Sequence, residues 1–211
     1  MACGAGFLAC EFAQHARWVY GVDLSARMLR EANALARTLG RDNISLCQAD
    51  AEALPFGAAA CDLVTCKLAF HYFPRPQVAL AEMVRVATPT ARVVLIDRVS
   101  PEDPEKRAYQ NRLEKLRTPS KTYVYSESQL VAMLEQAGLV VEQRARYAEP
   151  MDVGAWIQAA GPDERTAQEI LDLLITAGDP AGLAVRREAD RWVMTHQTCV
   201  LVARRRPPSV Y

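Results

Sequence analysis

Short apolar segments alternate with helical segments over the first hundred residues, and this alternation restricts the possible folds more than any other feature of the chain. The apolar segments have the composition of buried parallel strands, and they span 18–23, 44–50, 61–68 and 91–99. Helical spacing of apolar residues predicts helices at 6–16, 25–40 and 76–87. Because parallel strands are joined by right-handed helical crossovers, the alternation predicts a doubly wound α/β sheet.

The pattern changes after Val99. A polar helical stretch covers 101–117, and a capping box of Ser126 and Gln129 begins a further helix that Gly138 ends. The remaining segments are a strand at 139–147, a helical region at 151–180, and a strand, turn and strand at 184–205. We therefore expect a mostly parallel sheet with an antiparallel C-terminal edge, and helical insertions after the fourth and the fifth of these strands.

Composition and charge limit the class of protein. Half of the 211 residues are apolar, and 25 basic side chains equal 25 acidic ones, which suits one globular domain with a substantial core. A balanced charge without a basic stripe argues against nucleic acid as a partner, because phosphate binding needs clustered lysines and arginines. The three arginines at 204–206 are interpreted as a solvated tail.

Cysteine spacing and hydropathy give further expectations. The six cysteines lack the paired short spacing of a structural zinc site, so we predict no metal and interpret them as reduced and mostly buried. The chain has no apolar run of about 18 residues and no charged leader followed by an apolar run. We therefore expect no membrane span, no signal peptide and a cytoplasmic location.

The residues that follow the predicted strands are the candidates for a ligand site, because ligands of an open α/β sheet bind beyond the carboxyl ends of its strands. Gly4 and Gly6 let the backbone approach a ligand closely before the first helix. Asp23 is suited to accept two hydrogen bonds from ribose hydroxyls, and Asp50 to accept one from an exocyclic amine such as adenine N6. Residues 67–73 follow the next strand.

Each of these residues also has a purely structural interpretation. A glycine turn is a common helix start, Asp23 with Ser25 can be capping chemistry, and Asp50 can cap a short turn. What favours a nucleoside site is that all of them fall at one edge of one predicted sheet, in the order in which a nucleoside would be contacted.

Five segments match the motifs of a known enzyme family: ACGAGFLA (2–9), VDLSARML (22–29), QADAEALPF (48–56), LAFHYFPRP (68–76) and ALAEMVRVATPTARVVLID (79–97). They resemble the class I S-adenosylmethionine (SAM) methyltransferases, and in particular the bacterial group related to the ubiquinone/menaquinone C-methyltransferases. The resemblance extends into 99–126. It implies a Rossmann-like fold in a single domain over 1–211, with a cofactor-binding half at 1–99 and a substrate-side half at 100–211.

The resemblance also implies SAM as the cofactor and a set of residues that bind it. That set is Ala2, Gly4, Gly6, Asp23, Leu24, Met28, Asp50, Ala51, Lys67 and Leu68. The two glycines would lie against the methionine end of SAM. Asp23 would hold the ribose, with Leu24 and Met28 beside the adenine. Asp50 and Ala51 would contact the adenine edge, while the lysine and leucine after the third strand would face the cofactor.

The chain departs from the family pattern in two places. The family's proline–glycine turn before the fourth strand is replaced by ATPTAR (87–92). The family's first strand, with an acidic residue just before the glycine turn, is absent, and Met1 stands where the family carries an aliphatic residue. We expect that Met1 is not the natural start and that upstream codons encode this strand. The 211-residue chain is then expected to fold poorly, or to recruit a substitute strand by forming a homodimer.

A nicotinamide dinucleotide enzyme is the alternative within the same fold, because GAGFLA (4–9) also fits the Gly-x-Gly-x-x-Ala fingerprint. The QADAEALPF segment places a carboxylate where a single adenosine ends, whereas a dinucleotide would continue toward a second nucleotide. The C-terminal antiparallel pair also suits a methyltransferase better. SAM is therefore the predicted cofactor.

Methyl transfer from a sulfonium needs little acid–base machinery, because the donor brings its own leaving group. A hydroxyl acceptor benefits from a base, and His71 is the catalytic candidate because it is the histidine beside the predicted site. The alternative is that His71 packs against Phe70 and Phe73 and only shapes the pocket. Four nearby tyrosines and Lys121 fall in segments that could close over the site. The other two histidines are interpreted as structural.

The residues and the resemblance together predict a SAM-dependent methyltransferase. Its substrate would be a small, partly apolar metabolite, methylated on oxygen or carbon and less readily on nitrogen. Two other hypotheses stay open: a non-catalytic nucleoside-binding or interaction module, and a truncated fragment without a function of its own. Affinity for SAM separates them from the enzyme.

Overall fold

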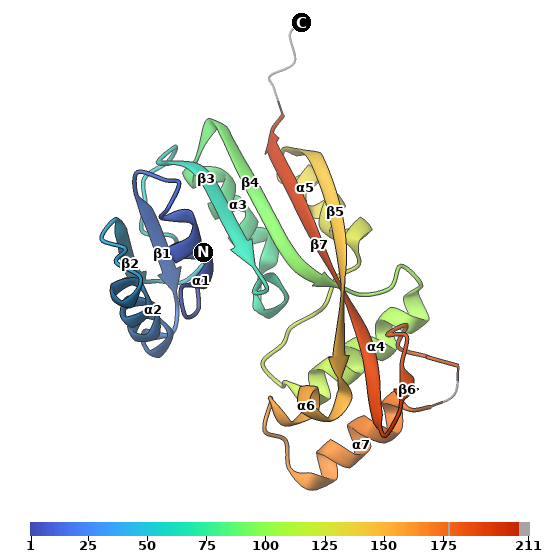
Figure 1. The fold of residues 1–211 in the computed structure, drawn as a ribbon. Helices are drawn as coiled ribbons and strands as arrows, with labels where there is room; N and C mark the ends of the chain where they lie inside the picture. The colour runs from blue at the N-terminus through green and yellow to red at the C-terminus, as the bar shows by residue number, and fades with distance from the viewer. Residues whose placement is uncertain (177, 207–211) are drawn as a thin grey trace, which may run out of the picture.

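The chain forms an α/β structure, and the computed structural model describes residues 1–176 and 178–206 (Figure 1). The N-terminal half alternates helices and strands, and the C-terminal half adds two long strands and several helices. The predicted α/β class, with parallel strands and an antiparallel C-terminal part, is confirmed.

The N-terminal elements follow the predicted alternation. They are α1 (Phe7–Phe12), β1 (Val19–Asp23), α2 (Ala26–Thr38), β2 (Ile44–Gln48), β3 (Cys61–Lys67), the 3-10 turn η1 (Phe70–Tyr72), α3 (Pro76–Val86) and β4 (Ala87–Val99). Ser25 Oγ accepts a hydrogen bond from the backbone N–H of Met28 at the start of α2, and Pro76 occupies the first turn of α3. β4 begins earlier than the predicted residue 91, because Ala87 already pairs with the first residue of β3.

The C-terminal elements are α4 (Pro104–Arg117), α5 (Glu127–Gln136), β5 (Leu139–Asp152), α6 (Val153–Gln158), α7 (Glu164–Leu174), β6 (Arg186–Glu188) and β7 (Arg191–Arg205). The predicted capping box is present, since Ser126 and Gln129 each accept a hydrogen bond from the other's backbone N–H. β5 continues past the predicted end at residue 147. The predicted helical region divides into α6 and α7, because the carboxylates of Asp152 and Asp163 cap two separate helices.

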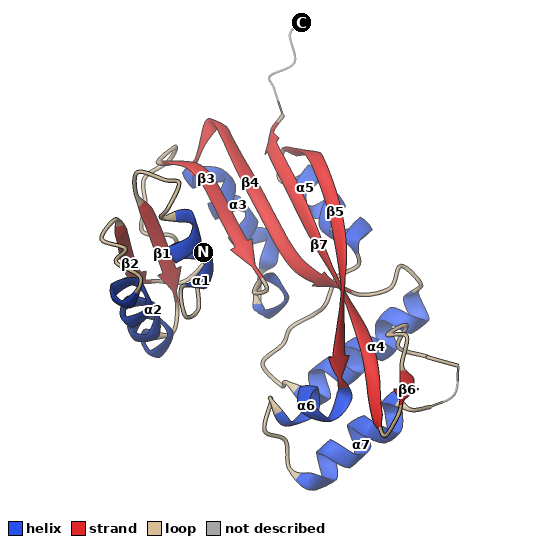
Figure 2. Ribbon diagram, viewed as in Figure 1, coloured by secondary structure: helices blue, strands red, loops and turns tan. Residues whose placement is uncertain are grey.

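Antiparallel pairing completes the sheet. The strand order is β3-β4-β7-β5, with β6 paired to β7, and β7 runs antiparallel to each of these neighbours (Figure 2). The terminal strand therefore lies inside the sheet, and β5 forms the edge. With 15 residues β7 is long enough to pair with β4 through its second half and with β5 along almost its whole length.

The sheet is divided in two between β1 and β3. β1 and β2 form a separate parallel pair, and within the described residues no strand bridges β1 to β3. A groove of about 510 Å³ lies between them, and Tyr20 and Leu63 on its walls are 51% and 42% exposed. The Met1 amino group reaches across and donates a hydrogen bond to the backbone oxygen of Thr65 at 2.8 Å. The expected upstream strand and homodimer stay predictions.

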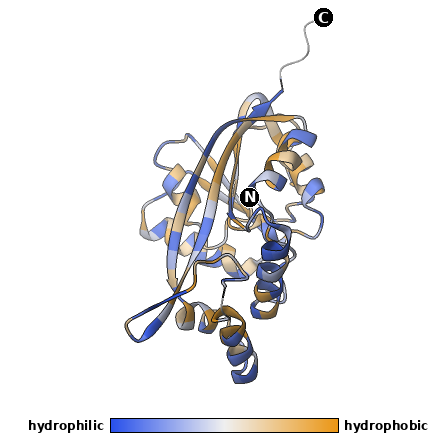
Figure 3. Cartoon of the chain, turned by 90° about the vertical axis from the view of Figure 1, so that its right-hand side faces the viewer, coloured by the Kyte–Doolittle hydropathy of each residue, from blue (hydrophilic) through white to orange (hydrophobic). Residues whose placement is uncertain are grey.

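Two apolar clusters form the core. The first lies against the larger sheet and includes Phe70, Leu80, Met83, Leu95 and Leu201. The second joins α4, α6, α7 and the start of β7, and includes Leu113, Trp156, Ile170, Leu174 and Met194. Figure 3 shows apolar residues alternating with hydrophilic ones along the long strands. Each buried side chain of this size stabilises the fold by about 1.5–3 kcal/mol, and β7 contributes to both clusters.

Other expectations about the chain have mixed outcomes. The six cysteines are free, but only Cys10, Cys66 and Cys199 are buried, so burial holds for half of them and not for most. None of the described helices is long and apolar enough to cross a membrane. The described residues contain no cluster of three or more histidine, cysteine or acidic side chains that could hold a metal ion.

Candidate active site

A pocket of about 720 Å³ lies at the carboxyl ends of β1 and β3, and we call it the strand-end pocket. The structure brings nearly all of the predicted cofactor residues together on its walls: Ala2, Gly4, Asp23, Leu24, Met28, Asp50, Ala51, Lys67 and Leu68. The volume is in the usual range of small-molecule sites, which is about 300–1,000 Å³. Topology produces this grouping, because parallel strands end at the same edge of the sheet.

Gly6 is the predicted cofactor residue that does not line the strand-end pocket. Its φ angle is 82°, and a Cβ atom added to it would lie 2.7 Å from the Cβ of Ala32. Glycine is therefore required there so that α1 can begin close against α2. Gly4 is different: its φ angle is 53°, and an added Cβ would meet no atom within 4 Å, so its backbone faces open space.

Asp23 ties the glycine turn to the end of β1. Its Oδ2 accepts a hydrogen bond from the backbone N–H of Gly4 at 2.7 Å, and its Oδ1 accepts one from Ser25 at 2.9 Å. Each carboxylate oxygen has a second lone pair, so Asp23 can still accept hydrogen bonds from a ligand. Leu24 beside it is 69% exposed, so the pocket wall has an apolar side chain that is open to solvent.

Asp50 combines a structural contact with a place on the pocket wall. Its Oδ1 accepts a hydrogen bond from the N–H of Glu52 at 2.9 Å, and its backbone oxygen accepts one from Ala53. The short turn that was the alternative interpretation of Asp50 is therefore present. Glu52 in turn accepts hydrogen bonds from the backbone and side chain of Arg75, and this joins the turn to the start of α3.

His71 lies in η1 next to the pocket, but it is not one of the residues that line it. Its side chain is 5% exposed, and its Nδ1 lies 2.5 Å from Oδ1 of Asp97. Asp97 also accepts hydrogen bonds from the backbone N–H groups of His71 at 3.1 Å and Arg98 at 2.8 Å. The carboxylate fixes the imidazole ring, with the Nδ1 proton directed at Asp97 and Nε2 left as the basic nitrogen.

The two phenylalanines considered as packing partners of His71 form an aromatic pair with each other. The ring centroids of Phe70 and Phe73 lie 5.6 Å apart, and His71 contacts the ring of Tyr72 at 4.4 Å. Tyr72 lines the strand-end pocket. Sequence reasoning missed Asp97, which lies two residues before the end of β4, whereas Asp23 is the last residue of β1. An acidic residue close to a predicted strand end was the signal that could have found it.

The loop over 118–126 covers η1. The backbone N–H groups of Thr122 and Tyr123 both donate hydrogen bonds to the backbone oxygen of His71. Lys121 is 5% exposed, and its Nζ lies 2.5 Å from Oε2 of Glu114, which is 2% exposed. Of the segments that could close over the site, this loop contacts η1. Tyr109 lies elsewhere, where its hydroxyl donates to the backbone oxygen of Leu173.

Burial changes the acidity of two groups near this loop. The pKa of the Tyr72 hydroxyl is raised, first by burial and then by the negative charge of Glu114, which Arg117 partly offsets. The pKa of His196 is held well below its ordinary value of 6.5, first by burial and then by the positive charges of Arg98 and Lys121. His196 is therefore a neutral histidine in the folded chain.

The low pKa of His196 predicts a loss of stability in acid. The unfolded chain binds a proton below the ordinary pKa of 6.5, whereas the folded chain does not until the pH reaches the lower folded value. The free energy of unfolding should therefore fall as pH falls below 6.5, by up to about 1.4 kcal/mol per pH unit from this residue. Urea unfolding at several pH values should show a smaller fall in His196→Phe. The exposed His15→Gln serves as the control, and an unchanged pH dependence in His196→Phe contradicts the prediction.

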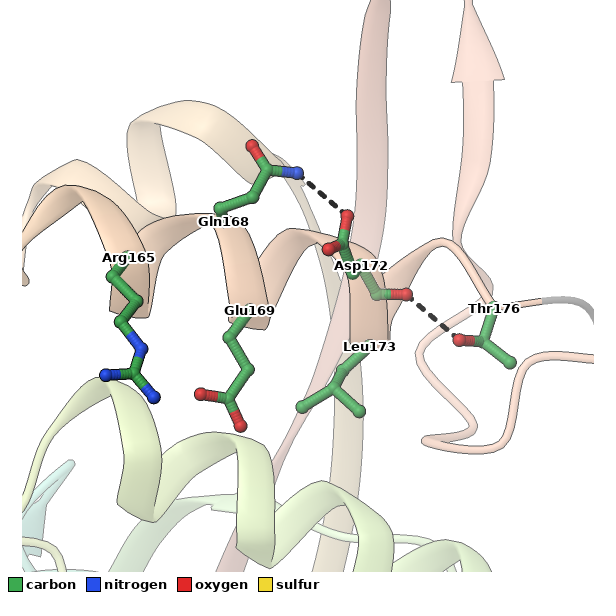
Figure 4. A pocket seen from close by; sticks show the side chains of 6 residues that line it. All are labelled: Arg165, Gln168, Glu169, Asp172, Leu173 and Thr176. Atoms are coloured by element: carbon green, nitrogen blue, oxygen red, sulfur yellow. Dashed lines mark hydrogen bonds between the residues drawn. The ribbon is translucent and has the colours of Figure 1, made fainter.

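A second hollow, of about 540 Å³, lies on α7 in the C-terminal half (Figure 4). Gln168 donates a hydrogen bond to Asp172 at 2.8 Å, and Thr176 donates one to the backbone oxygen of Asp172 at 2.9 Å. All the residues that line this hollow thus come from α7 and the turn that follows it. The strand-end pocket, by contrast, collects residues from several strands and loops, and it is the candidate active site.

Comparisons with known proteins agree with this assignment. Residues 1–95 match the family model described as a methyltransferase domain. The chain is 32% identical over 178 residues to the Bacillus subtilis (strain 168) protein named "Uncharacterized methyltransferase YcgJ", across 84% of this chain and 70% of that protein. The crystal structure of YcgJ superimposes with a TM-score of 0.90 and 27% identity, and the match covers 98% of this chain and 90% of that structure.

The ubiquinone/menaquinone biosynthesis C-methyltransferase UbiE of Syntrophotalea carbinolica is a further relative. It is 39% identical over 87 residues, which are 41% of this chain and 36% of that protein. The predicted resemblance to this group is thus confirmed. On the strength of the matched domain and of the similarity to YcgJ in sequence and structure, the chain belongs to the SAM-dependent methyltransferase family.

Proposed function

We propose that the chain transfers a methyl group from SAM to an oxygen or a carbon, and less readily a nitrogen, of a small, partly apolar acceptor. The observation that carries the proposal is the placement of a histidine–carboxylate pair, His71 and Asp97, directly beside the strand-end pocket that the family uses for its cofactor. Neither group alone would indicate a reaction, but together they support a base beside the proposed methyl donor.

The residues of the strand-end pocket fit SAM. Asp23 offers lone pairs for the ribose hydroxyls, and Leu24 and Met28 provide apolar cover for the adenine. Asp50 and Ala51 supply the polar edge contact for the base. The turn at Gly4 leaves room beside its backbone for the methionine end. When bound, SAM supplies an electrophilic methyl group on a sulfonium, which leaves as a neutral thioether.

His71 would act on the acceptor rather than on the cofactor. An acceptor hydroxyl would give its proton to Nε2 of His71 while its oxygen forms the new bond to the methyl carbon and the carbon–sulfur bond breaks. Asp97 stabilises the imidazolium that results and holds the ring in one orientation. Tyr72 and the apolar pocket wall exclude water from the line of transfer.

Transfer of label tests the proposed function. The purified chain is incubated with methyl-tritiated SAM and fractions of a bacterial small-molecule extract, and the tritiated product is separated and identified. Transfer to a small acceptor supports the proposal. Intact SAM binding without transfer to any fraction contradicts the proposal. Absent or very weak SAM binding supports the non-catalytic interaction module or the truncated fragment instead.

Replacing Asp23 with alanine is expected to weaken SAM binding by about 1.5–3 kcal/mol, the range for hydrogen bonds to a charged group. Asp23→Asn keeps one acceptor oxygen and should lose less. Isothermal titration calorimetry measures both, with the exposed Asp42→Ala as the matched control. Because Asp23 also holds the Gly4 turn, thermal unfolding checks that each variant is folded. A change of a few tenths of a kcal/mol in Asp23→Ala would reject the ribose contact.

A further inference from the structure

Arg98 lies near the end of β4, in the same region as Tyr72 of the strand-end pocket. In the parallel pairing of β3 and β4, Lys67 on the pocket wall is the partner of Ile96, so Arg98 is two residues further along its strand. The positive charge of Arg98 acts on the hydroxyl of Tyr72, whose ring contacts His71. A group bound to Arg98 would therefore lie near Tyr72 and the proposed base.

The Arg98 guanidinium is mostly buried but poorly satisfied. Its side chain is 17% exposed, and both terminal nitrogens lie 3.6 Å from the sulfur of Met151. The nearest carboxylate is that of Glu149 at 3.8 Å, which itself accepts a hydrogen bond from Thr198. Within the described residues, the side chain of Arg98 makes no hydrogen bond to an oxygen. Buried guanidinium groups ordinarily pair with carboxylates or carbonyl oxygens, so Arg98 has unused donors.

Arg117 of α4 is a second partly buried arginine in this region. Its guanidinium stacks on Trp156 at 4.4 Å, and its Nε donates a hydrogen bond to the backbone oxygen of that residue at 2.7 Å. Burial lowers its pKa, the negative charge of Glu114 opposes this shift, and the positive charge of Arg98 adds to it. The two guanidinium groups thus repel each other.

Several buried polar atoms on α4 and β7 lack hydrogen-bond partners within the described residues. His196 is fully buried, and its ring lies 5.7 Å from that of Trp156. Both of its nitrogens, one carboxylate oxygen of Glu114 and both polar atoms of the Gln110 side chain are buried and make no hydrogen bond in the described part of the chain. Buried polar groups are nearly always hydrogen-bonded. The donors and acceptors of this region can therefore form hydrogen bonds that its own side chains do not make.

The charges of the region balance in number, but not around Arg98. Three cations, Arg98, Arg117 and Lys121, lie with the carboxylates of Glu114 and Glu149, and the Asp97 carboxylate that holds the neutral His71 adds a third negative charge. Glu114 lies close to Lys121, whereas the carboxylate nearest to the Arg98 guanidinium is 3.8 Å away. Arg98 is thus a largely buried cation without a close ion pair, which is costly.

We propose that Arg98 and Arg117 bind the carboxylate of the methyl acceptor, so that the substrate is a small carboxylic acid. We call this the arginine subsite, and its assignment rests on the proposed function. The planar fork of arginine matches a carboxylate in two-point contact. A carboxylate brings one negative charge to these guanidinium groups, whereas the more highly charged phosphate monoester would bring further negative charge close to Glu114 and Glu149. The group that receives the methyl would then lie toward His71.

Binding of acids and of their uncharged amides tests the arginine subsite. The full chain, saturated with S-adenosylhomocysteine, is titrated calorimetrically with benzoate, phenylacetate and hexanoate and with the matching primary amides. At least one acid should bind about tenfold or more tighter than its amide, the effect of hydrogen bonds to a charged group. Arg98→Met should remove this preference and leave S-adenosylhomocysteine binding unchanged, and Arg98→Lys should restore part of it.

Arg112→Met is the matched control, because Arg112 lies on the exposed face of α4 and its variant should keep the preference. The proposal is overturned if no acid binds better than its amide, if Arg98→Met keeps the preference, or if phenyl phosphate binds more tightly than every acid. If the unaltered chain does not bind S-adenosylhomocysteine, that result contradicts the proposed function instead. Failure of the arginine subsite and failure of the proposed function are therefore distinguishable.

Discussion

Replacing His71 with alanine is expected to lower kcat for a hydroxyl acceptor by about 10²–10⁴-fold and to leave the affinity for SAM nearly unchanged. The physical reason is that His71 lies beside the strand-end pocket without lining it, while Asp97 directs its basic nitrogen away from the strand. Removal of the imidazole leaves the acceptor proton without a base but does not alter the cofactor contacts. The measurement is steady-state turnover with the acceptor found by label transfer, together with calorimetric SAM binding.

Two further variants distinguish a base from a packing residue. Asp97→Asn keeps the size of the side chain but no longer stabilises an imidazolium, so it should also lower kcat. His71→Gln fills much of the same space without a base of comparable strength and should resemble His71→Ala. The exposed His15→Ala is the control. Turnover that stays normal in His71→Ala would show that His71 only packs against Tyr72.

Replacing Lys121 with methionine should lower the free energy of unfolding by about 3–5 kcal/mol, because it leaves the Glu114 carboxylate buried without its partner. Lys121 Nζ and Glu114 Oε2 lie 2.5 Å apart, and both side chains are almost fully buried. Since a whole domain has a stability of about 5–15 kcal/mol, this single change removes a large share of it. Urea unfolding measures the loss, and the exposed Lys106→Met is the control.

The double variant Glu114→Leu with Lys121→Met sharpens this prediction. Replacing both partners of a buried ion pair by apolar groups is often neutral or stabilising, so most of the lost stability should return. The same loop donates two hydrogen bonds to the backbone oxygen of His71, so Lys121→Met should also lower turnover more than the double variant does. A single variant that unfolds within about 0.5 kcal/mol of the original chain would contradict the ion-pair account.

Short-range patterns predicted most of the secondary structure. The cap at Ser25, the capping box at Ser126 and the proline start at Pro76 each depend on residues within one helical turn, so they can be identified without knowing the fold. The acidic residue that ends β1 was recognised for the same reason. The boundaries of β4 and β5 were less accurate, because strand ends depend on which neighbour offers a partner.

Gly6 has a structural contact that the glycine motif did not predict. The pattern predicted a close approach of the backbone to a ligand, and at Gly6 the structure shows a close approach to Ala32 of α2. The choice between these partners depends on how two helices pack, which no local pattern encodes. Asp97 was missed for a related reason, since its role appears only when η1 places His71 against the end of β4.

The sequence by itself determined the α/β class, the helix caps and the group of residues at the strand ends, because these follow from periodicity, capping and the parallel direction of neighbouring strands. Only the tertiary structure decided that β7 lies between β4 and β5, and that the side chains of His71 and Asp97 meet. These contacts join residues far apart in the chain. They depend on the free energy of packing the whole molecule, in which each local preference is one small term.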